Sequence, residues 1–266
     1  MKYSIITINY NNRDGLRNTI ESIINQSYKD YEFIVIDGGS TDGSVDIINE
    51  YKDRITYWVS EKDNGIYHAM NKGVKAAHGE YLNFMNSGDS FYKSTTLEEV
   101  DNMMNGSDII VGSDYNEDPE TGKSAITVLP IRISFATFFM QTFPHQSTFI
   151  RRSLLDNSPY DEKLKIVADW KFFMNTIAYD ESSIQLIDLI ICKREQDGIS
   201  NIQSRKVNEE RKKVLSQLLP AGIKKDYDSL SKLDRSTMYK LLNLCDNNKA
   251  TLILTIAIKV LYRFFR

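Results

Sequence analysis

The chain has 266 residues, of which 41% are hydrophobic and 13 are glycine, a composition typical of one large globular domain or of a domain with an extension. The net charge of −3 hides an asymmetry, because residues 203–266 hold 14 Lys and Arg against 6 Asp and Glu, whereas residues 1–202 are net −11. Cys192 and Cys245 form no metal or disulfide pattern, and the N-terminus lacks the features of a signal peptide, so we expect a cytoplasmic protein.

Strands and helices alternate from residue 3 to residue 85. Uncharged or nearly uncharged segments rich in β-branched and aromatic residues predict strands at 3–9, 32–37, 55–59 and 80–85. Apolar residues at helical spacing predict helices at 15–27, from Val45 onward and at 66–77. This alternation favours a parallel, doubly wound α/β sheet.

Polar residues end three of these strands, at Asn9 to Asn11, at Asp37 and at Asn86 to Asp89. The carboxyl ends of parallel strands share one edge of a sheet, so these groups are expected to converge on one crevice. Asp89 could hold a divalent cation through oxygen, and Asp37 could accept hydrogen bonds from a base or a ribose. The alternative is that both acids only cap turns. Neither GxGxxG nor GxxxxGK[ST] is present, which argues against a nicotinamide dehydrogenase or a P-loop kinase.

The second half of the chain is less regular. We expect a strand at 108–113, a polar loop or hairpin at 114–124, an aromatic-rich helix or exposed wall at 133–143, and a strand at 184–196. From 204 the chain is helical and basic. In its last helix, 250–266, the polar residues Thr251, Thr255, Lys259 and Arg263 recur every four positions in an apolar background. Such a helix is short for a membrane span and is typical of a membrane interface, although packing on the catalytic domain or on a second copy of the chain is the alternative.

Five motifs resemble those of the family 2 glycosyltransferases with the GT-A fold. They occur in the family's order: Thr7-Ile8-Asn9-Tyr10-Asn11, Val35-Ile36-Asp37-Gly38-Gly39-Ser40-Thr41-Asp42-Gly43, Ser60-Glu61-Lys62-Asp63-Asn64-Gly65-Ile66-Tyr67-His68-Ala69-Met70-Asn71-Lys72-Gly73, Gly79-Glu80-Tyr81 and Asn86-Ser87-Gly88-Asp89. The resemblance is close over 1–115 and looser over 140–200. It implies a Rossmann-like, mainly parallel mixed sheet in a catalytic domain at 1–202, with a nucleotide-sugar half at 1–115 and an acceptor half at 116–202. A basic helical extension then follows at 203–266.

The resemblance also implies a reaction. Similar proteins take a nucleotide-sugar donor, most often a UDP-sugar, use a divalent metal such as Mn²⁺ or Mg²⁺, and invert the anomeric carbon. The amphipathic terminal helix then favours a glycan or lipid-linked acceptor in surface polysaccharide synthesis, with the enzyme peripheral on the inner face of the cytoplasmic membrane. An oligomer is compatible with this prediction. Nucleic-acid binding is not expected, because the aromatic residues of the tail lie in an apolar helix.

The resemblance assigns roles residue by residue. The donor side comprises Thr7, Asn9, Asn11, Asp37, Asp63, Lys72, Asn86, Ser87 and Gly88, the metal ligand is Asp89, the acceptor side comprises His145 and Gln146, and the catalytic base is Asp169. Many relatives carry a second acid next to Asp37, where this chain has Gly38, and more acids in the metal motif, where it has one. The loop Gln196-Asp197-Gly198-Ile199-Ser200 is expected to close over the donor.

The residues leave alternatives open. His145 could be a buried capping histidine and Asp169 an N-cap, although a helix-start carboxylate can both cap and act as a base. Two other functions compete with glycosyl transfer: a nucleotide-sugar-binding relative that lost activity, because the metal motif is acid-poor, and a nucleotidyltransferase. The latter normally has a Gly-rich basic loop after the first strand, and Asn9 to Asn12 is not one.

Overall fold

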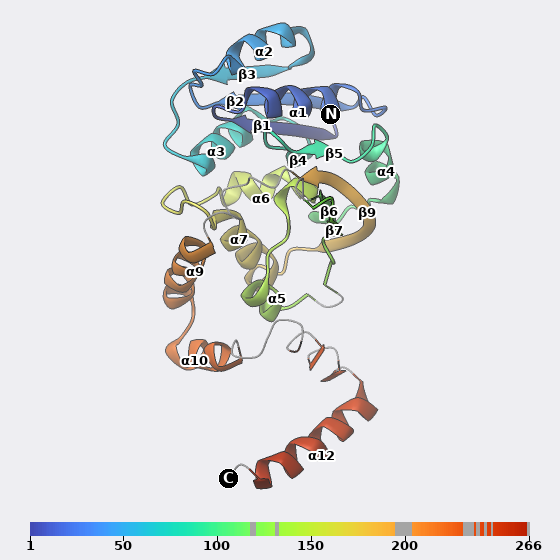
Figure 1. The fold of residues 1–266 in the computed structure, drawn as a ribbon, viewed down its shortest axis with the longest axis vertical. Coiled ribbons are helices and arrows are strands. Elements are labelled where there is room, and N and C mark those ends of the chain that lie inside the picture. Colours follow the sequence, from blue (N-terminus) through green and yellow to red (C-terminus); the bar gives the residue numbers. More distant parts are fainter. Residues whose placement is uncertain are drawn as a thin grey trace. The chain divides into compact units, whose positions relative to one another are not determined.

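The computed structural model describes residues 1–117, 121–130, 133–194, 204–230, 237, 240, 241, 244, 245 and 247–264. They form two compact units, the first from 1–129 with 142–211 and the second from 130–141 with 212–266 (Figure 1). The sequence did not suggest that 130–141 groups with the C-terminal helices. The domain boundaries at 115 and 202 stay predictions, and the loop 196–200 lies outside the described residues.

The first unit is built on one mixed sheet. Its strands are β1 (Tyr3–Asn9), β2 (Tyr31–Asp37), β3 (Tyr57–Ser60), β4 (Tyr81–Phe84), β5 (Ser90–Phe91), β6 (Ile109–Glu117), β7 (Ser124–Ile126), β8 (Thr148–Arg151) and β9 (Ile184–Arg194). The order is β3-β2-β1-β4-β8-β6-β9-β5, with β7 paired to β6 as the expected hairpin. Strands β1 to β4 are parallel, β8 runs antiparallel to β4 and β6, and β6 and β9 are parallel. The predicted Rossmann-like mixed sheet is therefore confirmed.

Helices follow the parallel strands in alternation. They are α1 (Arg13–Ile24), α2 (Ser44–Glu50), α3 (Ile66–Ala76) and α4 (Thr96–Met103), with the short helices η1 (Lys52–Arg54), α6 (Arg152–Asn157), α7 (Ala168–Phe173) and the π-helical η3 (Met174–Tyr179). Every residue of β1 is buried, as expected for a strand covered on both faces. Ile5 belongs to the core that includes Leu16 and Ile20 of α1. Ile6 faces α3, where a Cβ added at Gly73 would lie 2.4 Å from its Cγ2.

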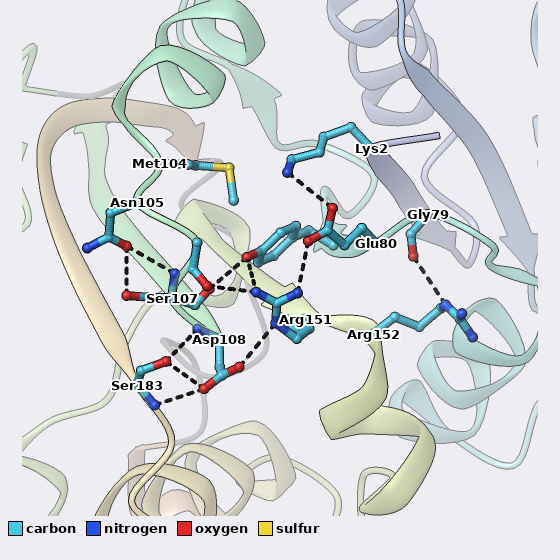
Figure 2. Close-up of polar contacts among 12 residues, drawn as sticks. Lys2, Gly79, Glu80, Met104, Asn105, Ser107, Asp108, Arg151, Arg152 and Ser183 are labelled. Carbon is cyan, nitrogen blue, oxygen red and sulfur yellow. Dashed lines mark hydrogen bonds and ion pairs between the residues drawn. The ribbon is translucent and has the colours of Figure 1, made fainter.

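An arginine joins the parallel and antiparallel parts of the sheet at the edge where β4 and β6 begin (Figure 2). Arg151, at the end of β8, contacts Glu80 at 2.8 Å, Asp108 at 3.1 Å and the hydroxyl of Tyr81 at 2.8 Å. Asp108 also accepts hydrogen bonds from the backbone N–H and the hydroxyl of Ser183 at the start of β9, at 3.0 and 2.6 Å. This cluster connects four strands at the edge opposite the predicted site.

The second unit contains α5 (Phe135–Met140), α10 (Ala221–Leu230), α12 (Asn248–Phe264) and the end of α9 (Ser204–Leu218). The ring of Tyr227 on α10 lies 5.0 Å from that of Phe135 and 5.1 Å from that of Phe139, which joins the aromatic helix predicted at 133–143 to the C-terminal helices. Of the described helices, none is both long and apolar enough to cross a membrane.

Candidate active site

The predicted convergence of strand ends is present in the structure. Strands β1 and β2 pair so that Asn9 lies opposite Asp37, and the Asn9 amide donates to Asp37 Oδ1 at 2.7 Å. The turn after β4 joins the same edge, since the N–H of Ser87 donates to the carbonyl of Ile8 at 3.1 Å. Thr7, by contrast, is fully buried within β1, and its hydroxyl donates a hydrogen bond to the carbonyl of Met85. Thr7 therefore joins β1 to the end of β4 and is not exposed to a ligand.

Asp37 is the centre of the loop that follows β2. Its carboxylate is buried and accepts five hydrogen bonds, from the Asn9 amide, the backbone of Gly39, both the backbone and the hydroxyl of Ser40, and the hydroxyl of Ser60. Burial raises the pKa of this carboxyl, but the hydrogen bonds from Ser40, Ser60 and Asn9 outweigh it, and the pKa is lowered. Asp37 is thus a charged anchor for residues 38–41.

Asn11 connects the loop after β1 to the loop after β2. Its backbone is left-handed, with φ of 50°, a conformation that Asn tolerates better than most residues. Its N–H donates to the Ser40 hydroxyl at 2.8 Å, and its side-chain oxygen accepts from the N–H of Thr41 at 2.9 Å. The loops after β1 and β2 therefore hold each other.

Asp63 and Lys72 lie beside that loop. Lys72 Nζ is 2.6 Å from Asp63 and 2.7 Å from Glu61, and the His68 ring is 3.0 Å from Asp63. Burial lowers the pKa of Lys72, but the hydrogen bonds to Asp63 and Glu61 outweigh it, and the pKa is raised, which keeps the lysine charged. A Cβ at Gly38 would lie 3.3 Å from Asp63 Oδ2. The absence of a second acid at position 38 is consistent with this crowding.

The turn Asn86-Ser87-Gly88-Asp89 is fastened to α1. Gly88 has φ of 100°, where a side chain would be strained, and its N–H donates to the Thr19 hydroxyl at 3.0 Å. That hydroxyl contacts the carbonyl of Asp89 at 2.6 Å. Asp89 itself is 6% exposed, and its Oδ2 accepts from the side chain of Gln146 at 3.0 Å.

The turn offers oxygen ligands for a hard cation. Among the described residues no group of three or more His, Cys, Asp or Glu could hold a metal. Two oxygens of the turn nevertheless fit Mn²⁺ or Mg²⁺: a carboxylate oxygen of Asp89, and Asn86 Oδ1, which is buried and has no hydrogen-bond partner in the described part of the chain. A site this poor in protein ligands requires further oxygens from a bound diphosphate and from water.

The predicted base and the predicted acceptor-side histidine are in contact. Asp169, in the first turn of α7, accepts from the Tyr67 hydroxyl at 2.9 Å and from the N–H of Trp170 at 2.8 Å, both on Oδ1, and its Oδ2 lies 3.1 Å from His145 Nδ1. His145 Nε2 lies 3.0 Å from the amide nitrogen of Asn86. Asp169 is not the N-cap of α7, a position that Val167 occupies.

Burial raises the pKa of Asp169, but the hydrogen bond and the electrostatic attraction of His145, together with the hydrogen bonds from Tyr67 and Trp170, outweigh it, so the pKa is lowered. Asp169 is therefore ionised at neutral pH and available as a proton acceptor. Tyr67 was not singled out from the sequence, although it lies in the third family motif. The side chain of Asn83 donates to the carbonyls of Gln146 and Thr148. Its only unusual feature in the sequence is that it is a polar residue within a buried strand.

A mixed, mainly parallel sheet with polar residues at the ends of β1, β2 and β4 has the architecture of a GT-A fold. The family model described as Glycosyl transferase family 2 matches residues 4–161. The chain belongs to this family and is a glycosyltransferase.

Relatives and a solved structure agree. The chain is 32% identical over 203 residues to an uncharacterized glycosyltransferase of Mycobacterium tuberculosis H37Rv, covering 74% of this chain and 76% of that protein. It is 28% identical over 209 residues to a PGL/p-HBAD biosynthesis glycosyltransferase of Mycobacterium bovis BCG, covering 75% and 79%. The structure of Staphylococcus aureus TarS 1–349 in complex with UDP-GlcNAc matches 74% of this chain and 60% of that one, with a TM-score of 0.60 and 20% identity, a likeness of fold.

Proposed function

We propose that this protein is an inverting glycosyltransferase that moves a sugar from a UDP-sugar to a hydroxyl of a glycan or lipid-linked acceptor by a single displacement. The observation that carries the proposal is that two carboxylates have different surroundings. Asp89, in the turn after β4, accepts from Gln146, whereas Asp169 accepts from Tyr67 and contacts His145. The fold shared with a UDP-GlcNAc complex supports the choice of donor.

The donor occupies the crevice at the strand ends. Asn9, Asn11 and the loop anchored by Asp37 shape the site for the nucleotide, with Asp63 and Lys72 at its side. The Asp37 carboxylate already accepts five hydrogen bonds from the protein. It therefore contributes to nucleotide binding by ordering the backbone of residues 38–41. Ser87 and Gly88 bring backbone close to the diphosphate, and Asn86 and Asp89 would hold the metal. A divalent cation bound there neutralises charge on the departing diphosphate.

The oxygen of the acceptor hydroxyl attacks the anomeric carbon, and Asp169 accepts the proton of that hydroxyl. Oδ1 already accepts two hydrogen bonds and Oδ2 accepts one from His145, so the remaining lone pair of Oδ2 is the one left for the acceptor. Attack opposite the leaving diphosphate inverts the anomeric carbon. The retained Asp89 and the ionised Asp169 favour this enzyme over an inactive relative.

Helix α12 supports a membrane-bound acceptor. Seven apolar residues of α12 are 48–67% exposed: Leu252, Ile253, Ile256, Ile258, Val260, Leu261 and Tyr262. The helix carries Lys249, Lys259 and Arg263 and no acid. Apolar residues with cations and no anions match an anionic lipid surface. We therefore place the enzyme peripherally on the inner face of the cytoplasmic membrane, where lipid-linked acceptors are extended.

One panel tests the function. The purified protein is incubated with UDP- and GDP-sugars and Mn²⁺ or Mg²⁺, and release of the nucleoside diphosphate is measured. We expect release from at least one UDP-sugar, dependent on the metal. Asp169→Asn should lose turnover and keep donor affinity. Absence of turnover and of UDP binding across the panel would refute the proposal. Full activity of Asp169→Asn would show that another residue is the base.

A further inference from the structure

Two consecutive side chains of one short helix reach the two carboxylates of the site. The helix is η2 (His145–Ser147). His145 Nδ1 lies 3.1 Å from Asp169 Oδ2, and the Gln146 side-chain nitrogen lies 3.0 Å from Asp89 Oδ2. One turn of backbone therefore contacts both the acceptor side and the leaving-group side of the site.

The backbone of η2 is held on several sides. The buried side chain of Asn83, in β4, donates to the carbonyls of Gln146 at 2.9 Å and Thr148 at 3.1 Å. The Ser147 hydroxyl donates to the carbonyl of Ser113 in β6 at 3.0 Å, and the Thr148 hydroxyl donates to the carbonyl of Pro144 at 2.7 Å. These four hydrogen bonds hold η2 and the residues that flank it against β4 and β6.

The His145 ring lies between Asn86 and Asp169. Its Nε2 is 3.0 Å from the Asn86 amide nitrogen, and its Nδ1 is 3.1 Å from Asp169 Oδ2. Asn86 belongs to the same turn as Asp89, whose N–H donates to the Asn86 carbonyl at 3.0 Å. The contacts of His145 with Asn86 and Asp169 thus join the turn Asn86-Ser87-Gly88-Asp89 to the proposed base.

We propose that η2 is a positioning element of the transfer reaction, in which His145 orients the base Asp169 and Gln146 orients Asp89, so that the two carboxylates keep one fixed separation. This inference rests on the proposed function. His145 acts through Asp169 and is a positioning residue. The reaction needs this because the acceptor oxygen and the departing diphosphate must lie in line, and a misplacement of about 1 Å can cost about 10²-fold in rate.

The ring also affects the protonation of the base. His145 supplies one of three hydrogen bonds that lower the pKa of Asp169, the others coming from Tyr67 and Trp170, and the buried Tyr160 also faces this carboxylate. With His145 removed, burial opposes fewer hydrogen bonds, and the pKa of Asp169 rises. The acid limb of the rate profile should then move to higher pH.

The test compares His145→Ala with His145→Asn, Gln146→Leu and the control His78→Ala. His78 is a matched control because its side chain is 80% exposed and lies away from the site, beside Glu32. Release of UDP from the UDP-sugar that the wild type turns over best gives kcat and its pH profile. Titration with UDP and Mn²⁺ gives donor-side affinity, and thermal melting reports folding.

We expect His145→Ala to lower kcat by about 10²-fold, to leave UDP affinity within about twofold and to move the acid limb to higher pH. His145→Asn, which keeps a donor, should recover part of kcat. Gln146→Leu should weaken the binding of UDP and Mn²⁺, whereas His145→Ala should lower kcat and leave UDP affinity nearly unchanged.

Wild-type kcat and an unmoved acid limb in His145→Ala would overturn the inference. So would a parallel loss of melting temperature, UDP affinity and kcat in that variant, which is the pattern of a purely structural side chain. A wild type that neither binds nor cleaves any UDP-sugar would instead refute the proposed function.

Discussion

Replacing Asp37 tests whether the crevice depends on one buried carboxylate. In Asp37→Ala, five donors lose their acceptor. The two hydroxyls and the Asn9 amide can rotate to other acceptors, but the N–H groups of Gly39 and Ser40, at 3.2 and 2.9 Å from the carboxylate, cannot move without shifting the loop. At about 1–3 kcal/mol for each buried donor left unpaired, the expected loss of unfolding free energy is about 3–5 kcal/mol.

Asp37→Asn should cost less. The backbone N–H groups of Gly39 and Ser40 both donate to Oδ2 of Asp37. In Asp37→Asn the side-chain oxygen should therefore take the Oδ2 position and the side-chain nitrogen the Oδ1 position. That side faces the Asn9 amide, whose own oxygen has no hydrogen-bond partner among the described residues. Rotation of the Asn9 amide would restore an acceptor. What remains is the loss of charge assistance, about 1–3 kcal/mol.

The effect should depend on pH with a definite sign. The pKa of Asp37 is lowered in the folded protein, so its contribution is fully present above the unfolded value, about 3.9, and is lost as pH falls through the folded value. The stability gap between wild type and Asp37→Asn should therefore be constant at neutral pH and narrow below about pH 4.

Urea unfolding at several pH values measures these differences, and UDP titration reports the crevice. We expect UDP affinity to fall more in Asp37→Ala than in Asp37→Asn. The reasoning is refuted if the two variants lose equal stability, or if the gap between wild type and Asp37→Asn widens as pH falls. Asn9→Ala is the companion variant: in its presence Asp37→Asn should cost less, because the two side chains share a hydrogen bond.

Two further predictions concern other parts of the chain. Arg151→Ala should lower the free energy of unfolding by about 1–3 kcal/mol, because the starts of β4 and β6 lose the cation that joins them to β8 at the edge away from the site. UDP affinity should be unchanged, and a loss of affinity without a loss of stability would contradict this role. On α12, Ile256→Asp should weaken sedimentation with anionic vesicles by about 10- to 100-fold, while Thr255→Asn should not; equal binding by both variants, or equal binding to neutral and anionic vesicles, would refute the lipid surface as the partner of this helix.

The parallel half of the fold could be predicted from the sequence. Uncharged β-branched segments such as Tyr3–Asn9 have high strand propensity and are buried on both faces. Parallel pairing in register then brings Asn9 beside Asp37, whatever the details of packing. Local patterns were enough here because each strand, turn and helix is decided by residues close in the chain. The predicted strand at 108–113 was extended to Glu117 by its pairing with β7 and β9, which no local pattern reports.

The site across the crevice depended on the tertiary structure. His145 and Asp169 are 24 positions apart, and His145 and Asn86 are 59 apart, so no periodicity connects them. The antiparallel placement of β8 beside β4 brings η2 to the turn Asn86-Ser87-Gly88-Asp89. The same holds for α5, whose aromatic residues meet Tyr227 of α10 across a long stretch of sequence. The sequence by itself determined which groups could do chemistry at the strand ends. The packing of distant segments decided which of them contact one another, because side-chain contacts across a sheet depend on strand order, and strand order is a property of the whole chain.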